Sequence, residues 1–228
     1  MKRLIMREDV TEELSEQDDE RTGLVLEPLR WALAAVDSGH PYEAVLLAQA
    51  PTVLPIWQAM AEALRNEGYS VAFGILRAEE FGVPQTRRRA VLIARRQGIA
   101  TLPRTTHQPY GKSAVNQSNP LPPYVSMSEV LNRPRPFNLI SNYGSGGDPK
   151  SRGRRTSTEP AFSVTAKFTR CKVATADGTE LERLTCAEAG RLQSFPADYP
   201  WAGVNQAQQI ANATPPLLAT HIVGAALL

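Results

Sequence analysis

The stretch FGVPQTRRRAVLIA, residues 81–94, carries the end of a short helical turn and the start of an apolar strand. The turn, AEEFGVP at 78–84, stops at Pro84 because proline cannot continue a helix. The run RAVLIAR at 89–95 is typical of a strand. A helical turn followed by an apolar strand indicates part of an α/β fold, and the residues before it extend that pattern.

The upstream residues alternate between helix and strand patterns. Helical spacing marks two segments and short apolar runs mark two more, which predicts helices over 22–36 and 52–66 and strands over 43–48 and 69–76. The run EAVLLA at 43–48 has the composition of a buried parallel strand. The alternation from 22 to 96 therefore predicts a partial α/β sheet with crossover connections, although it supplies only about three strands.

Two residues have expected positions near the ends of the predicted helices or at a kink. Pro28 is expected in the first turn of its helix or at a kink, because its ring excludes a normal helix interior. Gly68 is expected to cap the helix over 52–66, because glycine readily adopts the left-handed conformation at that position.

Residues 97–180 change character, because Pro, Gly, Ser, Thr and Asn dominate them. Two periodic pieces interrupt the segment: SMSEVL at 126–131 predicts a short helix, and AFSVTAKF at 161–168 predicts a strand. The remainder has the composition of turns, so 97–180 is interpreted as a small, loop-rich inserted lobe.

Helical signals return near the end of the sequence. Thr185 and Glu188 form a capping box at the start of one helix, and Pro215-Pro216 open a final one, PLLATHIVGAALL. Apolar residues surround nearly the whole circumference of that final helix, so we expect it to be buried on most sides. The short sheet offers little to bury it, which suggests that a covering part is missing or is supplied by another chain.

The composition limits the class of protein. The 228 residues are 42% hydrophobic and 21% charged, which is ordinary for a globular protein. No run approaches about 20 consecutive apolar residues, and the acidic first segment lacks the apolar core of a secretory signal, so neither a membrane span nor a leader is expected. Cys171 and Cys186 stand outside any CxxC or Cys/His pattern. No metal site is therefore expected, and a reducing cytoplasm fits best.

Positive charge gathers in one segment. Residues 133–172 contain nine Lys or Arg against two acids, whereas 8–20 contain eight acids and no base. Such segregation favours a polyanion as the partner of the basic segment. A solvated loop with scattered charges explains the same pattern equally well, so charge alone leaves both interpretations open.

Three stretches together resemble motifs of the DNA (cytosine-5)-methyltransferase family. FGVPQTRRRAVLIA is similar to the family's Gln-x-Arg-x-Arg motif, LTCAEAGRLQSFP at 184–196 to its Arg-Leu-Gln-x-Phe-Pro motif, and QIANATPPLLA at 209–219 to its closing motif. TGLVLEPLRWAL at 22–33 resembles a further family helix. The order and spacing agree with the family over most of the chain, with a variable segment between the first motif and the second.

The resemblance implies a fold and an organisation. The fold is an incomplete Rossmann-like sheet of an S-adenosylmethionine-dependent methyltransferase, with a small loop-rich target-recognition lobe. The implied parts are a polar, loosely ordered stretch, a partial methyltransferase α/β domain, the target-recognition lobe and a return to the catalytic domain, over 1–21, 22–96, 97–180 and 181–228. Double-stranded DNA is the implied partner and S-adenosyl-L-methionine the implied cofactor. A cytoplasmic, nucleoid-associated protein is expected.

The resemblance also assigns roles to particular residues. Gln85, Arg87 and Arg89 match the arginine motif, whose arginines in the family contact the flipped cytosine and the nearby DNA backbone. A cytosine must leave the base stack to be methylated at C5, and a guanidinium can hold a base oxygen and a phosphate in fixed geometry. The alternative is that Arg87 and Arg89 are surface residues that flank a strand.

The other matched residues have supporting roles. Arg191 and Gln193 match the motif that organises the lobe, and Asn212, Pro215 and Pro216 match the closing motif, which borders the cofactor pocket. Within the lobe, basic side chains would contact DNA phosphates with salt-sensitive affinity. These lobe residues are Lys150, Arg152, Arg154, Arg155, Lys167 and Arg170.

Pieces that the family's chemistry needs are not found in the sequence. The family's nucleophile is the cysteine of a Pro-Cys motif, because C6 of cytosine is a poor electrophile that needs a thiolate. Cys171 and Cys186 lie in no such motif and are interpreted as inert, and the family's glycine-rich cofactor loop is also not found. Ala48 occupies the place of the family's glutamate that grips the ring nitrogen of the target cytosine. Glu43 precedes the strand and is poorly placed to replace it.

Two functions are compatible with these features, besides an unrelated α/β protein with a Pro-rich insertion. In the first, the chain is the C-terminal part or subunit of a cytosine-5 methyltransferase that binds DNA, is inactive alone and completes its site with an N-terminal half from a second polypeptide. In the second, it is a non-catalytic DNA-binding protein or a decayed remnant. The short sheet and the final helix favour the first, whereas Ala48 and the missing Pro-Cys favour the second.

Overall fold

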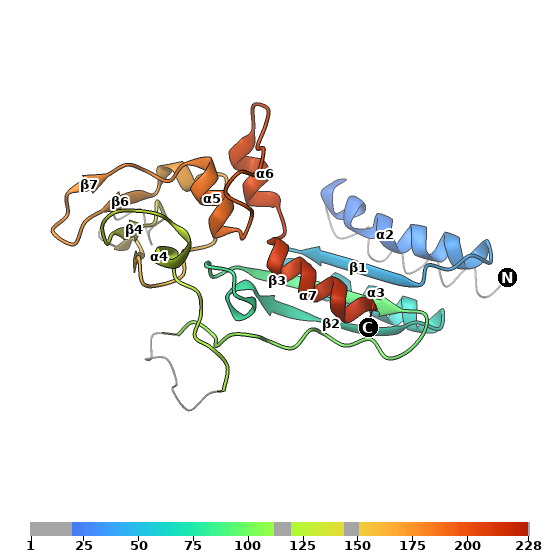
Figure 1. Ribbon diagram of the computed structural model, residues 1–228. Helices are drawn as coiled ribbons and strands as arrows, with labels where there is room; N and C mark the ends of the chain where they lie inside the picture. Colours follow the sequence, from blue (N-terminus) through green and yellow to red (C-terminus); the bar gives the residue numbers. More distant parts are fainter. Residues whose placement is uncertain (1–19, 112–119, 144–150, 228) are drawn as a thin grey trace. The chain divides into compact units, whose positions relative to one another are not determined.

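The computed structural model describes residues 20–111, 120–143 and 151–227 (Figure 1). The chain forms two compact units, each with its own hydrophobic core. The first unit contains the residues up to Ile75, Ala90–Leu102 and the end of the chain from Ala225, and the second contains Leu76–Arg89 and Pro103–Gly224. Residues 1–21 were predicted to be loosely ordered, and 1–19 of this stretch lie outside the described residues. Its last two residues already belong to a helix.

The helices and strands predicted before residue 96 are present. They are α2 (Glu20–Asp37), β1 (Ala44–Gln49), α3 (Leu54–Asn66), β2 (Ser70–Arg77) and β3 (Arg88–Arg95), with a short 3-10 turn, η1 (Pro51–Val53), before α3. Gly68 follows the end of α3 with a φ of 87°, which confirms the predicted glycine at this helix end. Pro28 lies well inside α2 rather than in its first turn, and the alternative prediction of a kink at this residue stays a prediction.

The three strands form one sheet in the order β1-β3-β2. β1 pairs antiparallel with β3, from Ala44 opposite Arg95 to Gln49 opposite Ala90. The prediction of a buried parallel strand at 43–48 is therefore wrong, because β1 lies at an edge and Leu46 is 36% exposed. An apolar run does not reveal whether both sides of a strand have neighbours. The central strand, β3, has a neighbouring strand on each side and is fully buried from Ala90 to Ala94.

One face of this sheet is covered by the two helices. Leu29 and Ala32 of α2 share a core with four buried residues of α3 (Trp57, Met60, Ala61 and Leu64), and alternate residues of β3, from Ala90 to Ala94, face the same core. The indole of Trp57 donates a hydrogen bond to the Ala90 carbonyl at 3.1 Å. This bond fixes α3 to β3, the strand that the arginine motif leads into.

The second unit contains a small antiparallel sheet that the sequence did not predict. Its strands are β4 (Asn138–Ile140), β5 (Arg154–Thr156), β6 (Lys172–Ala174) and β7 (Glu180–Leu181), in the order β5-β4-β6-β7. Each strand is too short for an alternating pattern to show, so the segment was interpreted as loop-rich. The predicted short helix is present as α4 (Met127–Val130), and a capping box formed by Ser126 and Glu129 begins it.

The strand predicted at 161–168 is not formed. Only Ala161 makes a β-bridge, with Gln85, and a 3-10 turn, η5, covers Phe168–Arg170. The backbone of this segment bonds to the arginine motif instead of a strand, since the Val164 amide donates to the Gln85 side chain at 2.9 Å. The apolar residues of the segment that suggested a strand, including Val164 and Phe168, belong to the core of the second unit.

The closing helices are α5 (Cys186–Leu192), α6 (Gln206–Asn212) and α7 (Pro216–Leu227). The capping box of Thr185 and Glu188 begins α5 as predicted. α7 is not buried on most sides: Leu218, Ile222 and Ala226 are buried at helical spacing, whereas Leu217, Val223 and Leu227 are exposed. One apolar face of α7 is therefore packed and another is not.

The residues from Gln206 to Leu227 are, by length and composition alone, apolar enough to cross a membrane. They form two helices, α6 and α7, with a break at 213–215. Each helix is shorter than the roughly 20 residues that a membrane span needs. The composition is therefore weak evidence for a span.

Candidate functional site

The arginine motif begins at a tight turn in the second unit. A 3-10 turn, η2 (Ala78–Phe81), ends at Gly82, whose φ of 78° favours glycine. A Cβ on Gly82 would lie 2.8 Å from the His107 ring, so this position also needs the small residue for space. The Ala78 amide donates to the Arg87 carbonyl at 2.8 Å, which closes the loop that carries Gln85 and Arg87.

Gln85 joins three separate segments of the second unit. Its side chain is fully buried, and its Nε2 donates to the Leu192 carbonyl and to Oε1 of Gln193, each at 2.8 Å. Its Oε1 accepts from the Val164 amide at 2.9 Å. Gln193 is also fully buried and donates to the Ile210 carbonyl. Residues that the sequence matched to three different motifs thus meet in one buried network.

Arg87 extends this network and carries its charge inside the protein. The residue is 5% exposed, and its guanidinium donates to the Val164 carbonyl at 3.0 Å and to the Ala211 carbonyl. Its Nε has no hydrogen-bond partner in the described chain. Burial, together with the nearby Arg89, lowers the pKa of Arg87 to about 10. We name Gln85, Arg87, Gln193 and the backbone groups that they bond the motif cluster.

Arg89 differs from Arg87 in its surroundings. It is partly exposed, and one recorded hydrogen bond of its guanidinium runs to the Arg88 carbonyl at 3.4 Å. Burial lowers its pKa. Of the matched trio, Arg89 is thus the residue with solvent-accessible, uncommitted donors for a DNA group, since the unbonded Nε of Arg87 is buried. The alternative that Arg87 is a surface residue is wrong, because its side chain is buried in the motif cluster.

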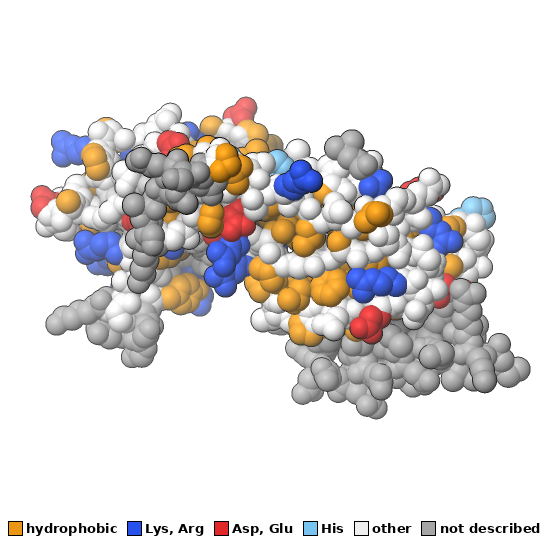
Figure 2. Space-filling model, turned by 90° about the horizontal axis from the view of Figure 1, so that it is seen from below, with side chains coloured by type: hydrophobic (Ala, Val, Ile, Leu, Met, Phe, Trp, Pro, Cys, Tyr) orange, Lys and Arg blue, Asp and Glu red, His pale blue; other side chains and the backbone are white. Residues whose placement is uncertain are grey.

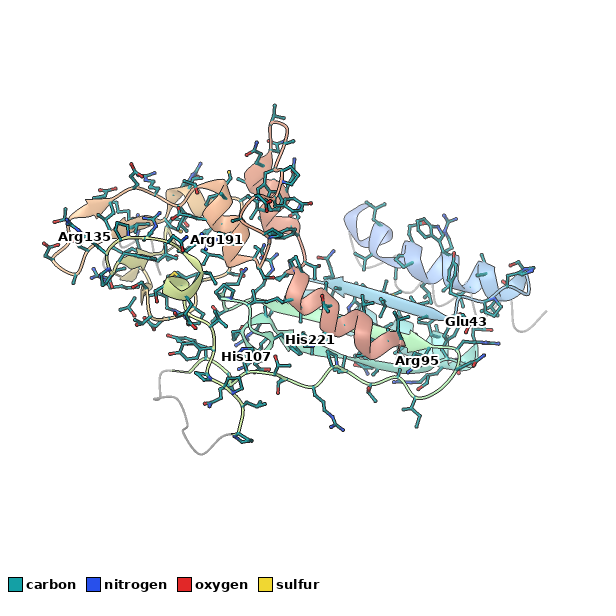
Figure 3. All side chains as sticks on the ribbon, in the orientation of Figure 1. Glu43, Arg95, His107, Arg135, Arg191 and His221 are labelled. Carbon is teal, nitrogen blue, oxygen red and sulfur yellow. The ribbon has the colours of Figure 1, made fainter. Side chains whose placement is uncertain are left out.

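The remaining matched residues lie on the closing helices. Arg191 is partly exposed in the last turn of α5 (Figure 3). Asn212 is exposed at the end of α6, where its Oδ1 accepts from Gln208 at 2.7 Å. Pro215 is buried and Pro216 begins α7. Their predicted roles, in organising the lobe and bordering a cofactor pocket, stay predictions.

The basic residues of the lobe divide into fixed and uncommitted cations, and Figure 2 shows Lys and Arg side chains on this part of the surface. Arg133 pairs with Glu188 at 2.6 Å, which ties the lobe to α5. In contrast, four of the side chains that the sequence predicted to contact DNA make no hydrogen bond or ion pair within the described segments. These are Arg152, Arg154, Lys167 and Arg170, while Lys150 lies outside the described residues. Uncommitted cations are the ones that can bind phosphates without first breaking a contact.

Arg155 is held in place by aromatic rings. Its guanidinium carbon lies 4.1 Å from the centroid of the Tyr110 ring and 4.9 Å from that of Phe162, and it donates to the Pro160 carbonyl at 3.1 Å. Burial raises the pKa of Tyr110 to about 12, helped by its hydrogen bond to Glu159. Such cation–π contacts stabilise a structure. Arg155 is therefore a structural cation, and its predicted contact with DNA would require it to leave these rings.

The second unit contains a cavity of about 340 Å³ next to the motif cluster. Its lining is largely apolar with a few hydroxyl and amide groups, and it includes Thr86, Asn142, Ser163 and Cys171. The Cys171 thiol donates to Oδ1 of Asn142 at 3.6 Å. Burial raises the pKa of this thiol, which disfavours the thiolate that a nucleophile needs.

We therefore expect Cys171 to react slowly with an alkylating reagent. At pH 8, iodoacetamide should modify it on the order of tenfold more slowly in the folded chain than in the chain unfolded in urea, because a raised pKa and burial both reduce reactive thiolate. Mass spectrometry of the Cys171 peptide over time measures the two rates. Equal rates in the folded and unfolded chain would contradict the assignment of Cys171 as an inert thiol.

Ala48 and Glu43 lie at opposite ends of β1 in the first unit. Glu43 precedes the first residue of the strand, near Arg95 (Figure 3), and its carbonyl accepts from the Arg96 amide. Ala48 is the last residue but one and is paired with Val91. In α/β sheets the ligand site lies at the carboxyl ends of the strands. The position matched to the family's glutamate therefore lies at the expected end, and Glu43 does not.

The sequence did not predict most of the hydrogen-bond partners of Gln85, Arg87 and Gln193. The carbonyls of Val164, Leu192, Ile210 and Ala211 accept the bonds of the motif cluster. A backbone carbonyl carries no residue-type signal, so no motif could have pointed to it. Composition shows that aromatic residues are present. It does not show that Tyr110 and Phe162, which are far apart in the sequence, both lie against Arg155.

Comparison with known proteins first defines the class of fold. A crystal structure of the Schizosaccharomyces pombe Dnmt2 methyltransferase aligns with a TM-score of 0.59 at 15% identity, covering 92% of this chain and 72% of that one. The Entamoeba histolytica methyltransferase EhMeth aligns with a TM-score of 0.57 at 15% identity, covering 91% and 69%. The fold is thus the one that these two methyltransferases have, as the motifs implied.

Sequence comparison then relates the chain to one family. Residues 46–133 match the family described as C-5 cytosine-specific DNA methylase. Type II methyltransferase M1.HphI of Haemophilus parahaemolyticus is 29% identical over 192 residues, and M.HgiDI of Herpetosiphon aurantiacus is 29% identical over 169. These matches confirm that the chain is related to the cytosine-5 DNA methyltransferases. It covers 50% and 52% of the two relatives, so it spans about half their length.

Proposed function

We propose that this chain is the C-terminal, DNA-recognising part of a DNA (cytosine-5)-methyltransferase. It binds double-stranded DNA and completes a methyl-transfer site with a part that carries the cofactor loop and the cysteine nucleophile. A second polypeptide supplies that part, and the chain alone does not transfer methyl groups. Such a protein works in the cytoplasm, on the nucleoid.

The motif cluster is the observation that carries this proposal. Three stretches resemble successive family motifs, and their residues meet in space through Gln85, Arg87 and Gln193. The side chains of the first motif bond the backbone of the second and of the closing motif. A chance resemblance of three short stretches gives no reason for their buried polar groups to satisfy one another.

DNA binding is supported by the two kinds of arginine. Arg87 is held inside the motif cluster, which fixes the strand that carries the partly exposed Arg89. The four uncommitted lobe cations, Arg152, Arg154, Lys167 and Arg170, provide charge for phosphates. In this proposal, Arg89 contacts the target nucleotide, and the lobe cations hold the duplex.

The 340 Å³ cavity of the second unit does not fit the cofactor by itself. The predicted border residues Asn212, Pro215 and Pro216 line no part of the 340 Å³ cavity. That cavity is largely apolar and contains no acidic or basic side chain that would bind the charged groups of S-adenosyl-L-methionine. No step of methyl transfer is therefore assigned to this chain alone, and cofactor binding is assigned to the completed protein.

The proposal is tested by methyl transfer from labelled S-adenosyl-L-methionine to mixed-sequence DNA. We would assay the chain alone and together with the polypeptide encoded immediately upstream. Activity that requires both is the expected result. If the folded mixture binds DNA without transferring methyl groups, the catalytic part of the proposal fails.

Arg154 is the lobe residue that best tests the DNA contact, because it is exposed on β5 and makes no recorded side-chain bond. Arg154→Ala should weaken DNA binding and reduce the slope of log affinity against log salt by about one. Fluorescence anisotropy of a labelled duplex at several salt concentrations measures both. Arg30→Ala, an exposed arginine on α2 that pairs with Glu27, should leave the slope unchanged.

Arg155→Ala should give a different result from Arg154→Ala. It removes the cation between Tyr110 and Phe162, so it should lower the free energy of unfolding by about 1–2 kcal/mol. An unaltered slope of log affinity against log salt for Arg154→Ala would count against the basic segment as the DNA-binding face.

A second function, a non-catalytic DNA-binding protein, is favoured by Ala48. The residue lies at the carboxyl end of β1, where the family places its glutamate, and a methyl group cannot bond a ring nitrogen. Salt-dependent DNA binding with no methyl transfer in any combination of chains is the result that this function predicts. The two functions therefore share the DNA-binding test and differ in the methyl-transfer test.

A further inference from the structure

Two histidines from different parts of the second unit lie against the turn at 78–82 that leads into the arginine motif, which we name the motif turn. His107 follows β3, and its ring lies beside Gly82, where an added Cβ would be 2.8 Å from its Cε1. His221 belongs to α7, and its ring centroid lies 5.3 Å from that of the buried Phe81 (Figure 3). Two successive residues of the motif turn are thus each packed against an imidazole ring.

Backbone hydrogen bonds join the His107 segment to the motif turn and the motif turn to the arginine motif. The amides of Thr106 and His107 donate to the Glu80 carbonyl at 2.9 and 3.0 Å. The Ala78 amide donates to the Arg87 carbonyl at 2.8 Å, and the next residue begins β3. A displacement of the motif turn therefore displaces the start of the strand that carries the arginines.

The surroundings of the two rings favour uncharged imidazoles. Both histidines are only partly exposed. Burial lowers the pKa of His107, and the nearby His221 lowers this pKa further, because two positive charges repel each other. The Nδ1 atom of His107 lies 3.0 Å from the hydroxyl of Thr106. A neutral ring can accept a hydrogen bond at this atom, whereas a protonated ring must donate one.

The acids near the pair do not offset a second positive charge. Glu129 of α4 raises the pKa of His107, but its effect is smaller than the effects of burial and of His221. Its carboxylate also accepts two hydrogen bonds at the start of α4, each at 2.6 Å. Glu80 of the motif turn pairs with Arg77 at 3.9 Å. These carboxylates are therefore engaged elsewhere.

Glu79, the other acid of the motif turn, has the opposite pH dependence. It is 4% exposed, and its carboxylate accepts from the Arg87 amide at 3.3 Å. Burial raises its pKa, so the folded chain binds this proton more readily than the unfolded chain does. Acidification therefore favours the folded turn through Glu79, and a loss of the turn in acid must have another cause.

We propose that His107 and His221 are positioning residues, which hold the motif turn in place while both are uncharged and release it when the pair binds a proton. Because the pKa of His107 is lowered in the folded chain, the unfolded chain binds that proton first. The stabilisation is therefore complete above the ordinary histidine pKa of about 6.5 and is lost as the pH falls below it. The arginine motif is thus held in place at neutral pH.

The chain contains three histidines, which allows a matched test. His107→Phe and His221→Phe each keep a ring in place but remove the site of protonation. His107→Gln is a second neutral variant, in case the larger phenyl ring disturbs the motif turn. His40→Phe is the control, because His40 is an exposed histidine of the first unit. Urea unfolding at neutral pH reports whether each variant is folded.

Nuclear magnetic resonance of the full chain measures the titration of the histidine rings and the exchange of the amides. We expect His107 to titrate below pH 6.5 and His221→Phe to raise that pKa. Between about pH 7.5 and about pH 5.5, protection of the Ala78, Thr106 and His107 amides should fall about tenfold, after correction for the intrinsic rate. It should fall equally in His40→Phe and by less than about twofold in His107→Phe and His107→Gln.

The consequence for DNA rests on the proposed function and is measured by fluorescence anisotropy of a labelled duplex over the same pH range. Acidification adds positive charge to the protein, which by itself strengthens DNA binding. If the motif turn is released, the unsubstituted chain should instead lose about threefold or more in affinity relative to His107→Phe. A purely structural role of the ring would give the two chains the same pH profile.

Three results would overturn the inference: titration of His107 above pH 6.5, pH-independent protection of the three amides, or an equal loss of protection in His107→Phe and His107→Gln. Failure of the proposed function is distinguishable from these results. Amides that open in acid, in a chain that binds no DNA at any pH, contradict only the function. DNA binding by a folded chain whose three amides stay protected in acid contradicts only the inference.

Discussion

Substitution of Ala48 by glutamate is expected to raise methyl transfer by the completed protein by about 100-fold or more. The residue lies near the carboxyl end of β1, opposite Val91, at the position that the family motif gives to a glutamate. A carboxyl group there would bond the ring nitrogen of the target cytosine and favour attack at C6. General-acid assistance of this kind contributes roughly 10²–10⁴-fold to a rate.

The increase should depend on the acid and on its position. Ala48→Gln has the same length as the glutamate but cannot supply a proton in the same way, so it should give a much smaller increase. Gln49→Glu places a carboxylate on the adjacent residue, which points to the other face of the strand. The measurement is the initial rate of methyl transfer at saturating DNA. If Ala48→Glu and Gln49→Glu behave alike, Ala48 is not the position of the family's glutamate.

Gln85→Ala is expected to lower the free energy of unfolding of the second unit by about 3 kcal/mol. The side chain is fully buried and makes three hydrogen bonds, to the Leu192 carbonyl, the Gln193 side chain and the Val164 amide. Removing it leaves those partners buried without a bond, and each unsatisfied buried group costs about 1–3 kcal/mol. Because the bonds join three segments, their loss also loosens the position of the strand that carries Arg89.

Urea unfolding, followed by far-ultraviolet circular dichroism, measures this effect. Gln208→Ala is the matched control, because Gln208 is an exposed glutamine whose side chain bonds Asn212 on the same helix. Surface substitutions of that kind usually change stability by about 0.5 kcal/mol or less. Similar unfolding free energies for the two variants would show that the Gln85 network does not hold the unit together.

The order of elements before residue 96 was predictable because each element is long enough to show its period. The helix at α3 and the apolar strand at β3 carry 13 and 8 residues, and proline and glycine mark their ends. The neighbours of a strand are not encoded in its own sequence. The run AVLLAQ of β1 was therefore predicted to be buried, whereas its position at the sheet edge leaves half of it exposed.

In the second unit, local sequence patterns did not predict the secondary structure well. Strands of two or three residues, such as β6 and β7, contain too few residues for an alternation of period two to be recognised. The segment at 161–168 alternates like a strand, yet its backbone bonds Gln85 and Arg87. Tertiary bonds decided its structure, and no property of the segment itself could reveal them.

The sequence singled out the residues of the candidate site, but it did not show which of them are buried and which are exposed. The motifs singled out Gln85, Arg87 and Arg89 together, but only Arg89 has unbonded donors on a partly exposed side chain. Burial of Arg87 depends on the carbonyls of Val164 and Ala211, which lie 77 and 124 residues away in the sequence. The resemblance grouped these residues in one motif, and their roles toward DNA stay predictions. The structure shows that Gln85 and Arg87 are buried and that Arg89 is partly exposed.

The motif cluster also has a consequence for the order in which the protein is made. Its bonds join residues separated by 107, 108 and 124 positions, so they close very long loops. Contacts of such high sequence separation form slowly, because the entropy of loop closure must be lost before they contribute. During synthesis, Gln85 and Arg87 leave the ribosome well before Ala211 does. The second unit should therefore acquire its native structure only after translation has passed the closing motif, and we expect it to depend on chaperones until then.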